Sequence, residues 1–424
     1  MYSLSASMGR RLGPAQPNST NKPALERSRE PEARAGHRCA LPEAFCSWPA
    51  TGGVMKFDAM AFAIGQGRRV AAWKFHREHR AQATAIHRTL QRYLGETNHA
   101  EIDRADAYAR EVLGHACYAP WLYVYTAIAG RFKEGWIPDN YYGRIVVPKL
   151  KGVYGVASSL KGLQRAVFAS NTFPDVAYYA NGLFITPDDK PIAPDAVTRE
   201  LFAGRDRLVF KIDNSRQGKG IFFFDRKTFD IDHVKALGSG VFQDVIVQHE
   251  ALGRFAPRSV ATLRLTTAVN DEGAVSVRAC YLRLGRDADT HVQSNSHVRI
   301  PVDCLSGQLS ERGYLTDWTV VRAHPDSKIP FAGVTIPAFD ACVTTVLTLH
   351  QKVLFDRCVG WDLAIAADGS VKVMECNAEH NDIKFSEATQ GPCFADLRWD
   401  RLVRHEAQPA KVTESPLPVS SGAL

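Results

Sequence analysis

Apolar side chains between residues 68 and 113 recur at steps of three and four, the spacing that places them on one face of a helix. The first stretch predicts a helix from Arg68 to about Leu94, with Gly95 as its C-cap. Its apolar positions are Val70, Trp73, Ile86, Leu90 and Tyr93. The second stretch predicts a helix over about 100–113. A helical segment therefore precedes the rest of the chain.

From about Arg144 onward, short runs of β-branched and aromatic residues alternate with Gly, Asp and Asn turns. One long helix interrupts them, from about Pro337 to Asp356. The predicted strands are Leu208–Asp213, Ile221–Phe224, Val245–Gln248, Ala261–Val269 and Val275–Leu284, followed by a hairpin within Trp361–Asn377. Strands with few helices between them predict an α+β fold rather than a doubly wound parallel sheet.

The two ends of the chain lack this periodicity. Residues 1–54 are rich in Pro, Ser, Arg and Ala, which predicts a disordered extension. Residues 404–424 are polar and Pro/Ser-rich, which predicts a flexible tail. Between these ends, the helical segment would occupy residues 55–135 and the main folded domain residues 136–403.

Composition narrows the classes of function. The chain has 424 residues, 45% of them hydrophobic, which suffices for a large core with two or three structural units. The net charge is +7, and much of it lies in the first hundred residues, so we expect no nucleic-acid partner. The longest apolar stretch, about residues 116–130, contains Pro120 and is too short to span a bilayer. The oligomeric state stays open.

Nine cysteines are scattered without a Cys-x-x-Cys pair, which argues against zinc-ribbon and thioredoxin sites. Unpaired cysteines in a long chain are typical of a reducing cytoplasm, where we expect the protein to reside. The run His76-Arg77-Glu78-His79 lacks the helical spacing of a metalloprotease motif, and we interpret it as a solvated helix face.

The predicted hairpin has a turn signal at Asp368-Gly369, because both residues tolerate positive φ. A two-residue turn there would place Ala367 opposite Ser370. The same register would place Asp362 opposite Glu375 on one face of the sheet. A slip of one residue would break this pairing.

Opposed carboxylates repel each other, so something must offset the pairing of Asp362 with Glu375. Asn377 lies on the same face, two residues beyond Glu375. An all-oxygen set of Asp, Glu and Asn suits Mg²⁺, which would offset the repulsion. The alternative is an exposed acidic hairpin beside a lysine or arginine. The apolar run around Asp362 favours the magnesium site.

Two basic residues lie inside predicted strands. Lys211 is followed by a polar loop, residues 215–220, whose glycines would let the backbone approach phosphate oxygens. The loop could equally be a plain hairpin turn, with Lys211 reaching the surface. Arg264 stands between Leu263 and Leu265, where an arginine requires an anionic partner. That partner could be a structural carboxylate or a phosphoryl group.

In this order, the motifs resemble the sugar-transfer-associated ATP-grasp family, also described as alpha-L-glutamate ligase-related, over roughly residues 130–400. The stretches that carry the resemblance are Gly135–Tyr142, Phe210–Ile221, Gln248–His249, Ser259–Arg264, Gly360–Ile365 and Met374–Asn377. The resemblance implies an ATP-grasp fold within residues 136–403, in which two α+β subdomains clasp ATP. The lid would span about residues 160–245, and the metal-binding core about 246–400.

The resemblance also implies roles for single residues. Lys211 and the 215–220 loop would cover the ATP phosphates, and Arg264 would face the transferring phosphoryl group. Lys149, Lys151 and Lys161 are candidates for a second phosphate lysine, with Lys161 preferred. The remaining ATP contacts would come from Ser215, Gln217, Gly218, Gly220, Gln248 and His249, and Mg²⁺ would be bound by Asp362, Glu375 and Asn377.

ATP-grasp ligases phosphorylate a substrate carboxylate, and an amine or similar nucleophile then attacks the acyl phosphate. The resemblance therefore implies an ATP- and Mg²⁺-dependent ligase with small-molecule substrates, acting in cell-surface polysaccharide or peptide-like metabolite assembly. Loops including residues 285–300 and 378–394 would contact the substrates. Two alternatives stay open, namely a kinase-like phosphotransferase and a catalytically silent nucleotide-binding protein.

Overall fold

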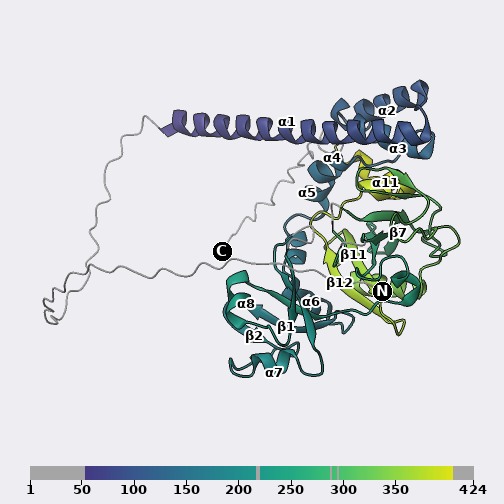
Figure 1. Ribbon diagram of the computed structural model, residues 1–424. Coiled ribbons are helices and arrows are strands. Elements are labelled where there is room, and N and C mark those ends of the chain that lie inside the picture. The colour runs from purple at the N-terminus through teal and green to yellow at the C-terminus, as the bar shows by residue number, and fades with distance from the viewer. Residues whose placement is uncertain (1–52, 216–219, 287–288, 294–295, 404–424) are drawn as a thin grey trace, which may run out of the picture. The chain divides into compact units, whose positions relative to one another are not determined.

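The computed structural model describes residues 53–215, 220–286, 289–293 and 296–403 of the chain. The chain divides into two units, Met1–Phe62 and Ala63–Leu424. In the first unit the described residues form the beginning of helix α1 (Gly53–Leu94). Every other element described below belongs to the second unit (Figure 1). Within the described ranges, no helix is long and apolar enough to cross a bilayer.

The second unit opens with the helical segment, which consists of α1, α2 (His99–Glu111) and α3 (Ala119–Ala129). Gly95, with φ of +88°, ends α1, and the Asn98 side chain caps α2. Both helices predicted here are present, but α1 begins at Gly53 instead of Arg68, so residues 53–54 are helical and not part of a disordered extension, whose other residues lie outside the described ranges. The shorter helices are η1 (Ala116–Tyr118), α4 (Asp139–Tyr141), η2 (Tyr142–Val146), α5 (Val147–Leu150), η3 (Tyr154–Ser159), η4 (Lys161–Leu163) and α6 (Gln164–Phe168).

A five-stranded antiparallel sheet follows, with strand order β2-β1-β5-β3-β4. Its strands are β1 (Asp175–Ala180), β2 (Leu183–Ile185), β3 (Arg207–Ile212), β4 (Ile221–Asp225) and β5 (Gly240–Asp244). Helices α7 (Val197–Leu201) and α8 (Ile231–Leu237) share its apolar core. Alternate residues of a strand point to opposite faces. Val209 and Lys211 therefore face away from this core.

The second sheet has seven strands in the order β10-β9-β8-β7-β6-β11-β12, again antiparallel. They are β6 (Thr262–Val269), β7 (Val275–Leu284), β8 (Val298–Pro301), β9 (Gly313–Tyr314), β10 (Val320–Val321), β11 (Cys358–Ile365) and β12 (Val371–Asn377). Helix α10 (Phe339–His350) packs on its apolar face and is shorter than the predicted Pro337–Asp356. The remaining helices are α9 (Glu250–Gly253), α11 (Lys384–Gln390), η5 (Ala395–Leu397) and η6 (Trp399–Arg401).

The α+β fold predicted from the sequence is confirmed, but the strand predicted at Val245–Gln248 is wrong. Strand β5 ends at Asp244, and Gln248 forms only a single bridge, with Ala366. The residues between them connect the two sheets, and their contact with the end of β11 is limited to this bridge and to hydrogen bonds from the Ala367 N–H to the Val247 carbonyl and from the His249 N–H to the Ile365 carbonyl. Val247 is accordingly 73% exposed. Apolar residues that link two sheets resemble a strand in sequence although they form none.

Candidate active site

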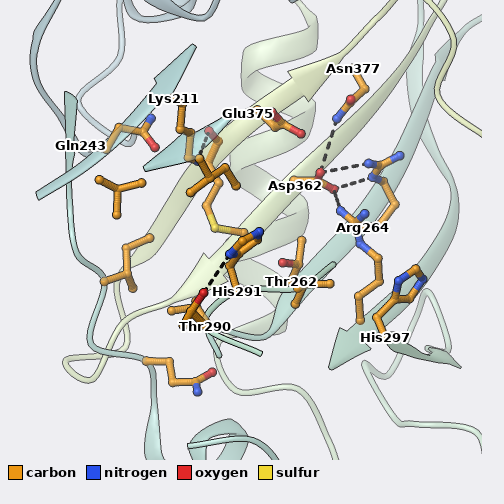
Figure 2. Close-up of a pocket in the computed structure, with 18 of the residues that line it drawn as sticks. Lys211, Gln243, Thr262, Arg264, Thr290, His291, His297, Asp362, Glu375 and Asn377 are labelled. Carbon is orange, nitrogen blue, oxygen red and sulfur yellow. Dashed lines mark hydrogen bonds and ion pairs between the residues drawn. The ribbon is translucent and has the colours of Figure 1, made fainter. Parts of the chain in front are cut away.

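A cavity of about 1380 Å³ lies between the two sheets, lined by side chains of both (Figure 2). Apolar and charged residues alternate along the strands of the seven-stranded sheet. Leu263, Leu265 and Leu282 belong to the core on one face. The opposite face lines the cavity with Thr262, Arg264, Tyr281, Arg283, Arg299, Asp362, Glu375 and Asn377. Period-two alternation thus collects the charged groups on one surface.

The β11–β12 hairpin places Asp362 opposite Glu375, as its sequence predicts. The predicted pairing of Ala367 with Ser370 is wrong, because the Ser370 carbonyl accepts from the Ala366 N–H at 2.9 Å. The loop therefore contains three residues and ends at Gly369, whose φ is +80°. This shifts the register by one residue near the turn.

A β-bulge at Met374 restores the predicted register. Leu363 pairs with Val373, whereas Asp362 pairs with Glu375, so Met374 has no partner in β11. Its carbonyl oxygen instead accepts a hydrogen bond from Lys211 Nζ at 3.2 Å. The bulge thus joins the strand of the acidic residues to the lysine strand of the smaller sheet.

Lys211 and Lys161 lie together in the cavity. Lys211 is 9% exposed, and burial lowers its pKa, while the Glu375 carboxylate acts in the opposite direction. Lys161 is also 9% exposed, and its Nζ donates to the Ser215 carbonyl at 3.1 Å and the Ser215 hydroxyl at 3.3 Å. Among the described residues, neither ammonium has a carboxylate oxygen within the 4.0 Å of an ion pair.

The other two candidate lysines lie elsewhere. Lys149 Nζ donates to the Leu402 carbonyl at 2.7 Å. Lys151 is 2% exposed, and its Nζ lies 5.5 Å from the centroid of the Tyr142 ring. Neither lysine lines the cavity. Of the three, only Lys161 has the position that the proposed phosphate contact requires.

Asp362 is enclosed by arginines. Its carboxylate accepts from Arg264 Nε at 2.5 Å and Nη2 at 2.9 Å, and from Arg283 Nη2 at 2.5 Å. Burial would raise its pKa, but these two guanidinium groups hold it well below its usual range. Asn377 Nδ2 lies 3.5 Å from the same carboxylate. The arginines therefore offset the repulsion from which the sequence predicted a metal ion.

Glu375 and Asn377 border the cavity on the same face as Asp362. Figure 2 shows the Glu375 carboxylate between Lys211 and Asn377. Within the described ranges, no group of three His, Cys, Asp or Glu side chains is placed to hold a metal ion. Mg²⁺ needs fewer, because it commonly takes one or two carboxylates together with substrate phosphates. Glu375, Asn377 and Asp362 fit that smaller requirement.

Four further nucleotide contacts were predicted in the loop after β3. Ser215 lines the cavity, whereas Gln217 and Gly218 lie outside the described residues. At Gly220 a Cβ would lie 2.3 Å from the Ser215 Cβ. Glycine is thus required there for close packing of the loop.

Gln248 and His249 have structural hydrogen bonds. The Gln248 side chain lines the cavity, but it donates to the carbonyls of Ala256 and Ser259 and accepts from the Ala261 N–H. His249 caps α9 through Nδ1, which accepts from the Ala251 N–H at 3.2 Å, and it does not line the cavity. Neither side chain therefore points to a nucleotide contact on its own geometry.

Sequence reasoning missed several cavity residues, above all Arg283 and Arg299. Each stands between apolar neighbours, as Arg264 does, in the runs Leu282-Arg283-Leu284 and Val298-Arg299-Ile300. The same pattern could have identified all three arginines. Gln243, His297, Asp382 and Lys384 also line the cavity. His297, Asp382 and Lys384, like Arg299, lie within the stretches 285–300 and 378–394 that were expected to contact substrates, but no sequence signal singled them out.

Comparison with known proteins finds one family and several solved structures. Residues 233–397 match the family described as sugar-transfer associated ATP-grasp. Three similar structures are ATP-grasp ligase PsnB complexed with minimal precursor (15% identity, TM-score 0.35), the ADP complex of N5-carboxyaminoimidazole ribonucleotide synthetase (10%, 0.35) and D-alanine-D-alanine ligase from Coxiella burnetii (13%, 0.33). The matches cover 61%, 57% and 60% of this chain, and 63%, 52% and 60% of those chains. No curated protein matches.

The chain therefore spans less than two thirds of the length of each of these structures. The ATP-grasp fold predicted from the sequence is confirmed, with a helical segment before it. The predicted resemblance is confirmed as well, and its matched part begins in α8 and reaches η5. The match to the sugar-transfer associated ATP-grasp family thus extends over residues 233–397 of the chain.

Proposed function

We propose that this protein is an ATP- and Mg²⁺-dependent ligase that activates a substrate carboxylate as an acyl phosphate. One observation carries the proposal. Lys161 and Lys211 are nearly buried, have no carboxylate partner among the described residues, and face the surface that holds Glu375 and Asn377. Buried cations without anionic partners are costly, so a polyanionic ligand between them is favoured.

The residues divide into three tasks. Lys161 and Lys211 hold the phosphates of ATP as point charges. Glu375 and Asn377, with Asp362, hold Mg²⁺, which when bound neutralises phosphate charge. Asp362 already accepts from four donor positions, so it must release one contact to join this set.

Arg264 has the capacity to hold the transferring group. Three of its hydrogen bonds go to Asp362 and to the Asn381 carbonyl. A guanidinium has five N–H donors, so two remain for a phosphoryl oxygen. Its neighbour Asp362 raises the pKa of Arg264 against the effect of burial, which keeps the positive charge in place.

The proposed reaction has two steps. A substrate carboxylate oxygen attacks the γ-phosphorus of ATP, the bond to the bridging oxygen breaks, and ADP leaves with the electron pair. The nucleophile then attacks the acyl carbon, inorganic phosphate leaves, and an attacking amine loses its proton to solvent. Positioning and charge neutralisation suffice for both steps, without a protein nucleophile.

Product analysis tests this reaction. The protein is incubated with Mg·ATP, a panel of carboxylic acids and hydroxylamine, which converts acyl phosphates into hydroxamates. A ligase forms hydroxamate, ADP and inorganic phosphate in equal amounts. A kinase-like enzyme forms ADP and a stable phosphorylated product without free phosphate. Binding of Mg·ATP with no turnover across the panel would favour the silent nucleotide-binding alternative.

We further propose a cytoplasmic setting and a role in polysaccharide or peptide-like metabolite assembly. All seven described cysteines have free thiols, which is consistent with a reducing compartment. The description of the matched family, sugar-transfer associated, supports the polysaccharide setting. Small-molecule acids and amines are the proposed substrates.

A further inference from the structure

Two arginines face each other directly on the cavity side of the larger sheet. Arg283 of β7 pairs with Arg299 of β8 in the antiparallel register. Like charges that are directly opposed destabilise a sheet. Arg264 lies on the same face, so three guanidinium groups gather at this end of the cavity. Their charge requires compensation.

The neighbouring acidic side chains do not supply enough negative charge to compensate the three arginines. Asp362 is shared by Arg264 and Arg283, which use both of its oxygens. Asp382 lies 2.9 Å from Lys384 Nζ and forms an ion pair with it. Lys384 also forms an ion pair with Asp139 at 3.4 Å. The three arginines and Lys384 thus face three carboxylates in the described part of this region, and none of the three lies within ion-pair distance of Arg299.

Arg299 is the arginine with the least compensation by negative charge. It is 7% exposed, and among the described residues no carboxylate oxygen lies within ion-pair distance of it. Its Nη2 donates to the Leu315 carbonyl at 3.1 Å, and its Nε has no hydrogen-bond partner in the part of the chain that the structure describes. A buried guanidinium without an anion is costly, and natural proteins seldom keep one without a ligand to meet it.

Aromatic side chains hold this guanidinium in place. Its central carbon lies 4.8 Å from the centroid of the Trp318 ring and 4.6 Å from that of Phe385. Cation–π contacts of this kind attract and orient the plane, but they provide no negative charge. His297 beside it is neutral at pH 7, because burial and the charge of Arg299 lower its pKa to about 4. The arginine is thus fixed in orientation before any ligand binds.

We propose that Arg299 and Arg283 bind an oxyanionic group, a carboxylate or a phosphate, on the non-reacting end of a ligase substrate. The proposal rests on the proposed function, because it assigns one of that reaction's substrates to the same cavity. A planar, oriented guanidinium matches an oxyanion with two hydrogen bonds. The substrate class is accordingly one that carries an anionic group besides the reacting group.

The test separates this inference from the proposed function. Calorimetry first measures binding of Mg·AMP-PNP, and its absence would count against the proposed function itself. With that nucleotide saturating, the unfolding temperature is measured with glutarate, with valerate and with inorganic phosphate. Glutarate and valerate have the same number of carbons, but valerate has only one carboxylate. We expect glutarate, phosphate or both to raise the unfolding temperature, and valerate to have a weaker effect.

Variants locate the effect. Arg299→Met should weaken binding of the responding probe about tenfold or more, because a charge-assisted hydrogen bond is lost. It should change the unfolding temperature of the ligand-free protein only slightly, because the buried charge that it removes has no carboxylate partner in the described ranges, which offsets the lost Leu315 hydrogen bond and ring contacts. Arg258→Met is the matched control, because Arg258 lines the cavity but is exposed and distant in sequence from the two arginines.

Arg299→Lys keeps the charge without the planar donor pair, so its probe response should be intermediate. It also provides a readout if Arg299→Met does not fold. A response to glutarate alone assigns a carboxylate, and a response to phosphate alone assigns a phosphate. The inference is overturned if neither probe exceeds valerate, or if the response is equal in the wild type and the Arg299 variants.

Discussion

At the scale of single residues, the buried lysine of the smaller sheet has two roles to separate. Lys211 donates to the Met374 carbonyl and thereby joins the two sheets, and it also faces the proposed phosphate site. Its burial lowers its pKa, which shows that its surroundings do not fully compensate the charge. A buried lysine whose charge is not fully compensated is expected to serve a ligand more than the fold.

We expect Lys211→Met to weaken Mg·ATP binding about tenfold or more, because one charge-assisted contact to phosphate is lost. The ligand-free protein should change in free energy of unfolding by only about 1 kcal/mol, the value of one hydrogen bond. Calorimetry and urea denaturation measure the two quantities. Lys227→Met, an exposed position after β4, is the control. A large loss of ligand-free stability would make Lys211 structural.

Glu375→Gln tests the metal assignment. The amide keeps the size of the side chain but lacks the charge that Mg²⁺ prefers. Affinity for ATP in the presence of Mg²⁺ should fall about tenfold or more, while affinity for Mg²⁺-free ATP should be unchanged or higher, since a negative charge near the phosphates is removed. Glu272→Gln, on an exposed turn, is the control. Equal Mg·ATP affinity in both variants would disprove the assignment.

Sequence reasoning at this scale found Arg264 and missed Arg283 and Arg299. Charged residues between apolar neighbours identify a buried cation, but they do not identify its partner. The partner of Arg264 turned out to be Asp362, which lies 98 positions away in the chain. Such pairings depend on which strands become neighbours, which local sequence does not determine.

At the scale of elements, the β11–β12 hairpin sets the geometry of the acidic residues. The pairing of Asp362 with Glu375 was predicted correctly, although the predicted turn was one residue too short. The bulge at Met374 shifts the register back by one residue, so the predicted pairing of Asp362 with Glu375 still forms. Turn residues are visible in a sequence, but bulges have weak sequence signals, so a correct register can result from two opposite deviations.

The turn of this hairpin offers a direct test of backbone strain. Gly369 has φ of +80°, and a Cβ there would meet no atom within 4 Å. Gly369→Ala should therefore destabilise the protein by about 1–2 kcal/mol through conformation alone. Gly67→Ala in helix α1 also meets open space, but at an ordinary φ, and should stabilise by about 0.5–1 kcal/mol. Chemical denaturation measures both, and equal effects would contradict the explanation.

At the scale of the whole molecule, Glu387 joins the segment that follows α3 to the C-terminal part of the fold. The carboxylate of this fully buried residue accepts from the Ile137 N–H and the Cys393 N–H, each at 2.8 Å. Burial raises its pKa to about 7. The local sequence does not predict that Glu387 is buried. Its burial follows from the tertiary packing of the folded chain.

Glu387 should make stability depend on pH. Its folded pKa, about 7, lies above the unfolded value of about 4.5, so its contribution is fully present below pH 4.5. The contribution is lost as the pH rises through 7, at up to about 1.4 kcal/mol per pH unit. Urea denaturation between pH 5 and pH 8 should show this decline in the wild type and a smaller one in Glu387→Gln. Parallel pH dependences would exclude Glu387 as the source.

The four contacts of Asp362 affect how strongly the ligand-free protein can bind an anion. Asp362 is a permanent internal competitor for the guanidinium groups that an incoming anion would use. At Arg264 and Arg283, ligand binding is therefore a replacement of one anion by another, whereas Arg299 has no described carboxylate to be replaced. The measured affinity will reflect the difference between the interaction of the arginines with the ligand and their interaction with Asp362. It will therefore be weaker than the interaction of the arginines with the ligand alone.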